Sequence, residues 1–150
     1  MDGKAFLGRG LKFPLAVDPR TGKFAMVEQE EDIREAIGIV LTTVRGERVM
    51  RPTFGSNVIS YTFATASSSM MQSIAHEVRE QLLFHEPRIV DVEVVCREVN
   101  HLTGAIVVEV AYTVRSTNNR YNHVYPFYLS EGAGGGAAQS EKACFGWAYR

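Results

Sequence analysis

The sequence lacks the features that most directly identify a class of function. It has two cysteines among its 150 residues, Cys96 and Cys144, and neither belongs to a CxxC pair. Isolated cysteines of this kind support neither a disulfide framework nor a zinc site. No apolar run approaches the roughly 18 residues of a transmembrane helix, so we expect no membrane partner.

An excess of charge of one sign is also missing. Sixteen lysines and arginines face 17 aspartates and glutamates, which leaves a net charge of −1. Because free-standing nucleic-acid-binding domains are usually strongly basic, we expect no nucleic-acid partner. The four histidines show neither an HExxH motif nor paired helical spacing, so we expect no metal and no other cofactor.

What the sequence does contain is typical of one globular domain followed by a tail. Hydrophobic residues make up 45% of the chain, which is enough for a sizeable core. We place the domain at residues 1–130. Residues 131–150 form a Gly/Ala-rich tail that ends in three aromatics, Phe145, Trp147 and Tyr149. This tail is either a partly disordered terminus or a short anchor for a partner.

Apolar periodicity predicts two amphipathic helices. In residues 30–44, apolar side chains recur at helical spacing from Ile33 to Val44, after a run of acidic residues. We expect Gly46 to end this helix. Residues 69–84 show the same period, with the serines at 67–69 as an N-terminal cap and Pro87 as the stop.

Alternating apolar residues and turn signals predict β-structure around these helices. Residues 11–17 and 23–27 should pair as a hairpin, because Asp18–Gly22 contains the proline and glycine of a reverse turn. Three further strands are expected at residues 89–99, 105–114 and 122–129. In the first of these, Val90, Val92, Val94 and Cys96 should share one face.

Two prolines and the order of the elements set the expected architecture. Pro14 and Pro126 indicate edge strands, because proline cannot donate to a β-ladder. Exposed edges accept strands from other chains. We predict an α+β fold, with two main helices packed on a small mixed, mostly antiparallel sheet.

The exit of the first helix is a candidate partner-binding segment. Residues 45–55 hold three arginines, two glycines and a proline within a short stretch. They are either a helix stop with a charged loop or a surface that binds another protein. The residues that would make this contact are Arg45, Glu47, Arg48, Arg51, Pro52 and Phe54.

A second candidate lies between the second helix and the following strand. Pro87 restricts its own backbone and that of Glu86, so that Glu86 and Arg88 are held in a stiff turn. A carboxylate and a guanidinium in such a turn can bind a partner. They can equally form a local salt bridge at a helix end.

Four features together resemble a known family. They are GRGLKFP at residues 8–14, the acidic-capped helix from Glu30, GERVMRPTFG at 46–55 and EPRI at 86–89. The chain, over about residues 5–130, resembles the phage GPW-type baseplate wedge family. These are the small sheath initiators of contractile tails, and the TssE subunit of type VI secretion is one of them.

The resemblance implies a structural role without catalysis. It predicts a baseplate component of a contractile injection system, which could be a phage tail, a tailocin, a toxin-injection particle or a type VI-like apparatus. The implied partners are baseplate wedge proteins, sheath subunits and tail-tube or hub proteins, with six copies in a ring. Assembly would take place in the bacterial cytoplasm, followed by incorporation into the particle. The family's contact with the wedge core is implied for Glu86, Pro87 and Arg88.

Two other functions remain open at this point. Some family members are described as lysozyme-like, and a peptidoglycan hydrolase would need two carboxylates across a cleft. The chain has many acidic residues, but no motif singles out a catalytic pair. A generic interaction module outside any contractile machine is the other alternative.

Overall fold

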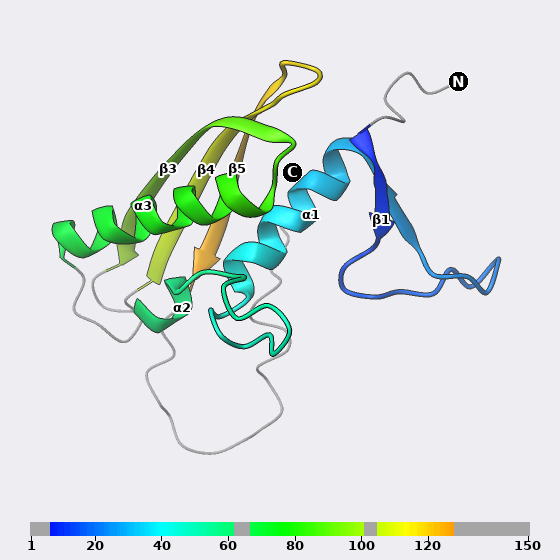
Figure 1. Ribbon diagram of the computed structural model, residues 1–150, viewed down its shortest axis with the longest axis horizontal. Coiled ribbons are helices and arrows are strands. Elements are labelled where there is room, and N and C mark those ends of the chain that lie inside the picture. Colours follow the sequence, from blue (N-terminus) through cyan, green and yellow to red (C-terminus); the bar gives the residue numbers. More distant parts are fainter. Residues whose placement is uncertain (1–6, 62–66, 101–104, 128–150) are drawn as a thin grey trace.

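The computed structural model describes residues 7–61, 67–100 and 105–127. Two main helices and two antiparallel sheets account for most of these residues (Figure 1). In chain order the elements are β1 (Arg9–Leu11), β2 (Met26–Glu28), α1 (Gln29–Thr42), α2 (Val58–Tyr61), α3 (Ser68–His85), β3 (Ile89–Asn100), β4 (Ala105–Val114) and β5 (Arg120–Phe127).

The strands form two separate sheets rather than the single sheet expected. One contains β3, β4 and β5 in sequence order, and the other pairs β1 with β2. All of these pairings are antiparallel. Within the described residues, the parallel pairing is confined to an isolated bridge between Val44 and Ser56. The predicted α+β class is confirmed.

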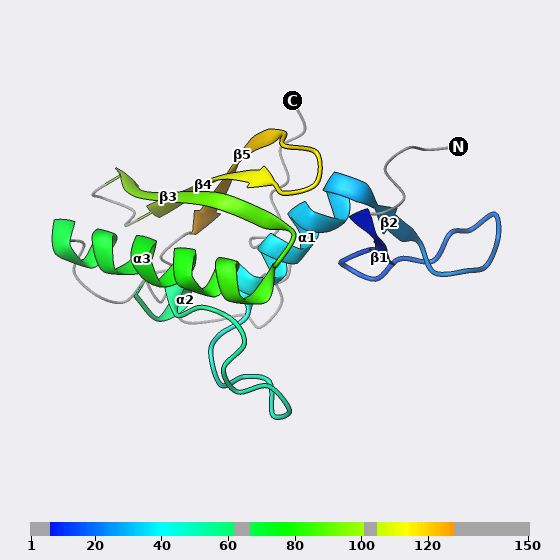
Figure 2. The same ribbon diagram turned by 45° about the horizontal axis from the view of Figure 1, so that its top comes forward.

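The core lies between the two main helices and one face of the three-stranded sheet (Figure 2). The alternation predicted for residues 105–114 is confirmed, because every second side chain of β4 from Ile106 to Val114 is buried. The helices face it with their predicted apolar stripes. The fully buried side chains of α1 and α3 are Ile33, Ile37, Leu41, Ile74, Val78 and Leu82.

A β-bulge changes the expected face of β3. Val90 pairs with Thr113, but the next pair joins Glu93 to Ala111, and Asp91 between them has a φ of +51°. The extra residue places Ile89 and Val92 in the core, while Val90 is only half-buried. The expectation that Val90 and Val92 share one face is therefore wrong.

The helix ends agree with the sequence at three of four positions. α3 begins as expected, since the Ser67 hydroxyl accepts a hydrogen bond from the Met70 amide at 3.2 Å. It stops before Pro87. α1 starts close to the predicted position but ends at Thr42, where Thr43 turns extended. Gly46 lies in the following turn with a φ of +87°, so the prediction that it ends the helix is wrong.

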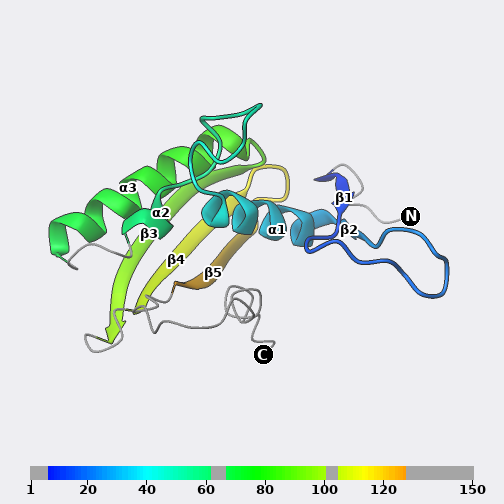
Figure 3. The ribbon, with the colours of Figure 1, turned by 90° about the horizontal axis from the view of Figure 1, so that it is seen from below.

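The hairpin projects from the body as a narrow arm (Figure 3). Its turn is confirmed: the Asp18 carbonyl accepts from the Gly22 amide at 2.8 Å, and Gly22 has a φ of +67°. Both strands are shorter than predicted, and β1 overlaps the predicted strand at residues 11–17 only at Leu11. Pro14 lies outside β1, so its assignment to an edge strand is wrong. Pro126 does lie in β5, at the edge of its sheet.

The short helix α2 was not predicted. Leu129 and the tail at residues 131–150 lie outside the described residues. No helix within the described segments is both long and apolar enough to span a bilayer.

Candidate functional site

The turn that joins α3 to β3 contains a buried carboxylate. Glu86 follows the last residue of α3, and its amide donates to the Leu82 carbonyl at 2.9 Å. Pro87 then prevents the helix from continuing. Glu86 is only 4% exposed, whereas Pro87 is exposed and Arg88 is half-buried.

Arg88 satisfies this carboxylate with both arms of its guanidinium. Its Nε donates to Glu86 Oε1 and its Nη2 to Glu86 Oε2, each at 2.6 Å. The Arg88 amide also donates to Oε1 at 3.2 Å. This bidentate pairing raises the pKa of Arg88 above its ordinary value. The local salt bridge that the sequence left open as an alternative is therefore present.

The same guanidinium also binds two distant segments. Arg88 Nη1 donates to Asp32 Oδ2 in the first turn of α1 at 2.6 Å, and to the Leu7 carbonyl at 3.0 Å. Four of its five N–H groups are thus engaged within the chain. We call Asp32, Glu86 and Arg88, with the Leu7 carbonyl, the arginine cluster. It ties the N-terminal segment, α1 and the α3–β3 turn together.

Two glycines of the GRGLKFP stretch allow the chain to approach this cluster. A Cβ on Gly10 would lie 2.3 Å from Asp32 Oδ1. Gly8 has a φ of +99°, and a Cβ there would lie 3.4 Å from Arg88 Nη1. The sequence singled out this stretch and the EPR motif separately, and the structure brings them together.

A shallow cavity opens beside the cluster. Its volume is about 210 Å³, and its lining residues are Leu7, Pro87, Arg88, Arg115 and Ser116. The Arg115 amide donates to the Arg88 carbonyl at 2.9 Å. Its guanidinium is exposed and makes no ion pair within the described part of the chain. Arg115 and Asp32 could not be predicted as site residues from the sequence, because only the fold places them next to the EPR motif.

The second predicted segment is a loop that its own backbone hydrogen bonds hold together. The Gly46 amide donates to the Pro52 carbonyl at 2.9 Å and closes its base. The Arg51 amide donates to the Arg48 carbonyl at 3.1 Å, which makes Val49 and Met50 the central residues of a tight turn. We call Arg48–Arg51 the tip turn.

The loop base is held against α1 by close backbone contacts. The Ser56 amide donates to the Thr43 carbonyl at 2.9 Å, and the Ser56 hydroxyl donates to the Leu41 carbonyl at 3.0 Å. Gly55 has a φ of +104°, and a Cβ there would lie 2.3 Å from the Thr43 carbonyl oxygen. Glu47 accepts from the Val44 amide at 3.0 Å, so its carboxylate serves the loop itself.

Ring contacts connect the loop to the end of α3. The Arg48 guanidinium lies over the Phe54 ring at 4.2 Å. Phe54 in turn contacts His85, with ring centroids 4.7 Å apart, and His85 contacts Phe84 at 4.9 Å. Since His85 directly precedes Glu86, both predicted segments meet at the C-terminal end of α3.

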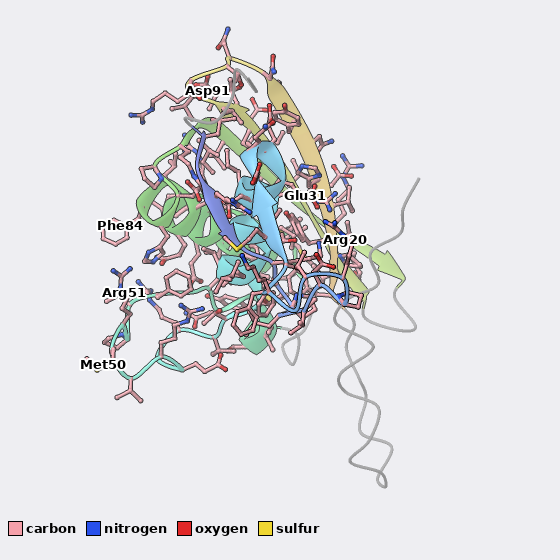
Figure 4. All side chains as sticks on the ribbon, turned by 90° about the vertical axis from the view of Figure 1, so that its right-hand side faces the viewer. Arg20, Glu31, Met50, Arg51, Phe84 and Asp91 are labelled. Atoms are coloured by element: carbon pink, nitrogen blue, oxygen red, sulfur yellow. The ribbon has the colours of Figure 1, made fainter. Side chains whose placement is uncertain are left out.

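Gln81 and Arg45 add a polar contact to the same junction. With its amide oriented to satisfy both ends, Gln81 donates to the Gly55 carbonyl at 3.1 Å and accepts from Arg45 Nη2 at 3.3 Å. Arg51 and Pro52 are exposed beyond it. Met50, Arg51 and Phe84 line one side of the molecule, opposite Arg20 and Glu31 (Figure 4).

Two other types of site can be assessed directly. Across the described residues, no group of three or more His, Cys, Asp or Glu side chains is arranged to hold a metal ion. Cys96 lies in β3, where burial raises the pKa of its thiol to about 11. At that pKa the thiolate is scarce near neutral pH, so Cys96 is a weak nucleophile.

Comparison with known proteins supplies the context for this geometry. The family model described as "Baseplate wedge protein gp25" matches residues 27–119. A Geobacter sulfurreducens protein with the provisional name tail lysozyme is 45% identical, with a TM-score of 0.63. That match covers 73% of this chain and 100% of the other. No curated protein sequence matches the chain.

Two solved assemblies contain chains with the same fold. A chain of the anti-feeding prophage baseplate is 20% identical with a TM-score of 0.60, over 84% of this chain and 89% of that one. A chain of the type VI secretion baseplate complex is 16% identical with a TM-score of 0.57, over 66% and 92%. The family match spans both predicted segments and most of the core. The chain therefore belongs to the gp25 family of baseplate wedge proteins.

Proposed function

We propose that this baseplate component holds wedge subunits of a contractile injection system and starts the polymerisation of its sheath. The observation that carries the proposal is the junction at the end of α3, where the EPR turn and the 45–55 loop meet on one rigid frame. Rigid frames suit a baseplate, because preorganised surfaces lose little conformational entropy on binding.

The structure favours an indirect role for part of the EPR motif. Glu86 is buried, and most of the N–H groups of Arg88 donate hydrogen bonds within the chain. In the proposed role these two residues shape the surface that a wedge subunit meets. Pro87 and Arg115 present the exposed part of that surface at the cavity. In the proposed assembly six copies form a ring, in which repetition strengthens individually weak contacts. Assembly takes place in the bacterial cytoplasm.

We further propose that the protein is not an enzyme. A glycoside hydrolase needs two carboxyl groups facing each other across a substrate cleft. The two buried glutamates of the described core are both engaged inside the chain. Glu86 pairs with Arg88, and Glu35 accepts from the Phe13 amide at 2.8 Å and from Lys12 Nζ at 3.3 Å. Peptidoglycan hydrolysis that copurifies with this chain would contradict the proposal.

The test is to image particles from cells whose only copy of this protein carries Pro87→Ser and Arg115→Glu. Both side chains are exposed, and loss of the proline restraint should cost no more than about 1 kcal/mol, so we expect a folded protein and tubes or baseplates without sheath. The matched control is Arg20→Glu, an exposed arginine in the turn of the hairpin that does not line the cavity. It should give normal particles. Fully sheathed particles from the double variant would contradict the proposed wedge surface.

A further inference from the structure

The tip turn of the 45–55 loop exposes apolar side chains that the fold itself does not use. Val49 is 91% exposed and Met50 is 92% exposed. Phe84, at the end of α3, is 76% exposed and is linked to the loop through the His85 and Phe54 rings. Apolar residues gathered on one side of a soluble protein mark an interaction site more often than isolated ones do.

This surface is held in place before any partner binds. The Gly46–Pro52 and Arg48–Arg51 hydrogen bonds fix the backbone of the tip turn, and the Arg48 guanidinium rests on Phe54. A preorganised turn avoids part of the ordering cost that a flexible loop pays on binding.

The charge of the surface indicates the chemistry of its partner. Arg48 and Arg51 flank the tip turn and Arg45 lies at the loop base, so three arginines stand against the single carboxylate of Glu47, which accepts from the Val44 amide. The chain as a whole has a net charge of only −1, so this is a local excess of positive charge. Arg, Met and aromatic residues are also the types enriched at protein–protein interfaces.

One exposed acidic residue of α3, Glu80, restricts how a partner can be oriented on this surface. Glu80 is exposed one helical turn before Phe84, so the α3 side of the surface is not uniformly basic. A complementary partner would therefore place its carboxylates against the arginines of the tip turn. The apolar part of its surface would lie between the tip turn and Phe84. An anionic membrane fits less well, because only two neighbouring apolar side chains project from the turn and Glu80 would face the lipid headgroups.

We propose that Val49 and Met50 insert into an apolar groove on another baseplate protein, whose acidic rim binds Arg48 and Arg51. This inference rests on the proposed function and names the partner chemistry of the loop. It assigns the loop a contact separate from the wedge surface at Pro87 and Arg115.

The test places a photo-crosslinking amino acid at position 50 in particles assembled by the producing cells. We expect a crosslink to a peptide of another baseplate protein that contains apolar and acidic residues. Adding Arg48→Glu and Arg51→Glu should lower the crosslink yield at least tenfold. The matched control carries the crosslinker at Val124, an exposed apolar residue on β5, and its yield should not respond to the arginine changes.

Several results would overturn the inference. They are a crosslink to a second copy of this chain, a crosslink that ignores the arginine reversal, or no crosslink at position 50 in sheathed particles that contain the chain. A flotation assay with phosphatidylglycerol vesicles could give a further contradicting result. If the protein binds the vesicles and Met50→Ser abolishes this binding, the tip turn binds a membrane. If the chain is absent from the particles, both the proposed function and this inference fail. If the chain is present but position 50 behaves in one of the ways above, only this inference fails.

Discussion

The EPR turn and the 45–55 loop have similar compositions but opposite arrangements. Both combine arginine, glutamate and proline next to the end of a helix. In the EPR turn the charges face inward: Glu86 is buried, and Arg88 binds two carboxylates and a carbonyl of the chain. In the loop the backbone is bonded inward, and Val49, Met50 and Arg51 face outward. Composition alone does not decide whether a charged segment stabilises the fold or presents a surface.

The largest effect on stability is expected at Arg88. Arg88→Ala leaves Glu86 buried without its partner, which should lower the free energy of unfolding by about 3 kcal/mol. The control is Arg97→Ala, which removes an ion pair between exposed Arg97 and half-buried Glu109 and should cost no more than about 1 kcal/mol. Urea unfolding of both variants measures the difference. Equal losses would mean that the arginine cluster stabilises the fold no more than a surface ion pair does. The charges of the EPR turn would then not differ from exposed charges in their effect on stability.

A smaller loss is expected at the base of the loop. Gly55→Ala adds a Cβ that clashes with the Thr43 carbonyl at a left-handed backbone position, which should cost about 2–3 kcal/mol. Gly22→Ala is the matched control, because Gly22 is also left-handed but has open space around it. It should cost only about 1 kcal/mol. If the two variants melt at the same temperature, the close approach of the loop base to α1 contributes nothing.

The smallest effect on stability is expected at the tip turn. Val49→Ser with Met50→Ser should change the free energy of unfolding by less than about 0.5 kcal/mol, since both side chains are exposed. Val110→Ser, in the core, serves as the destabilised reference. Thermal melts of both variants are sufficient. A loss above about 1 kcal/mol for the tip variant would show that Val49 and Met50 pack on the body. It would contradict the conclusion that the tip turn faces outward.

Local patterns in the sequence were enough to predict the main elements. The alternation in β4, the apolar stripes of α1 and α3 and the serine cap are each encoded within a few neighbouring residues. The bulge at Asp91 and the early end of α1 were missed, because the tertiary fold decides them rather than local propensity.

The candidate site was only half predictable for the same reason. The EPR motif and the GRG stretch were both visible, but the link between them joins residues that are 81 and 56 positions apart. No local signal marks Asp32 as the partner of Arg88, or Arg115 as the neighbour of Pro87. Asp32 instead carried an ordinary local explanation, as one of several acidic residues at a helix N-terminus.

Arg88 binds residues that lie far before it in the sequence, and this determines the order in which contacts can form during translation. The Leu7 carbonyl and the Asp32 carboxylate lack the Arg88 guanidinium that they bind in the folded protein until residue 88 has been synthesised. At about 5–20 residues per second, the 81 residues that separate Leu7 from Arg88 take roughly 4–16 s to translate. During that interval the N-terminal arm and the first turn of α1 lack this fastening. The arm is made first and can bind Glu35 of α1, but its tie to Arg88 can close only after the α3–β3 turn has emerged.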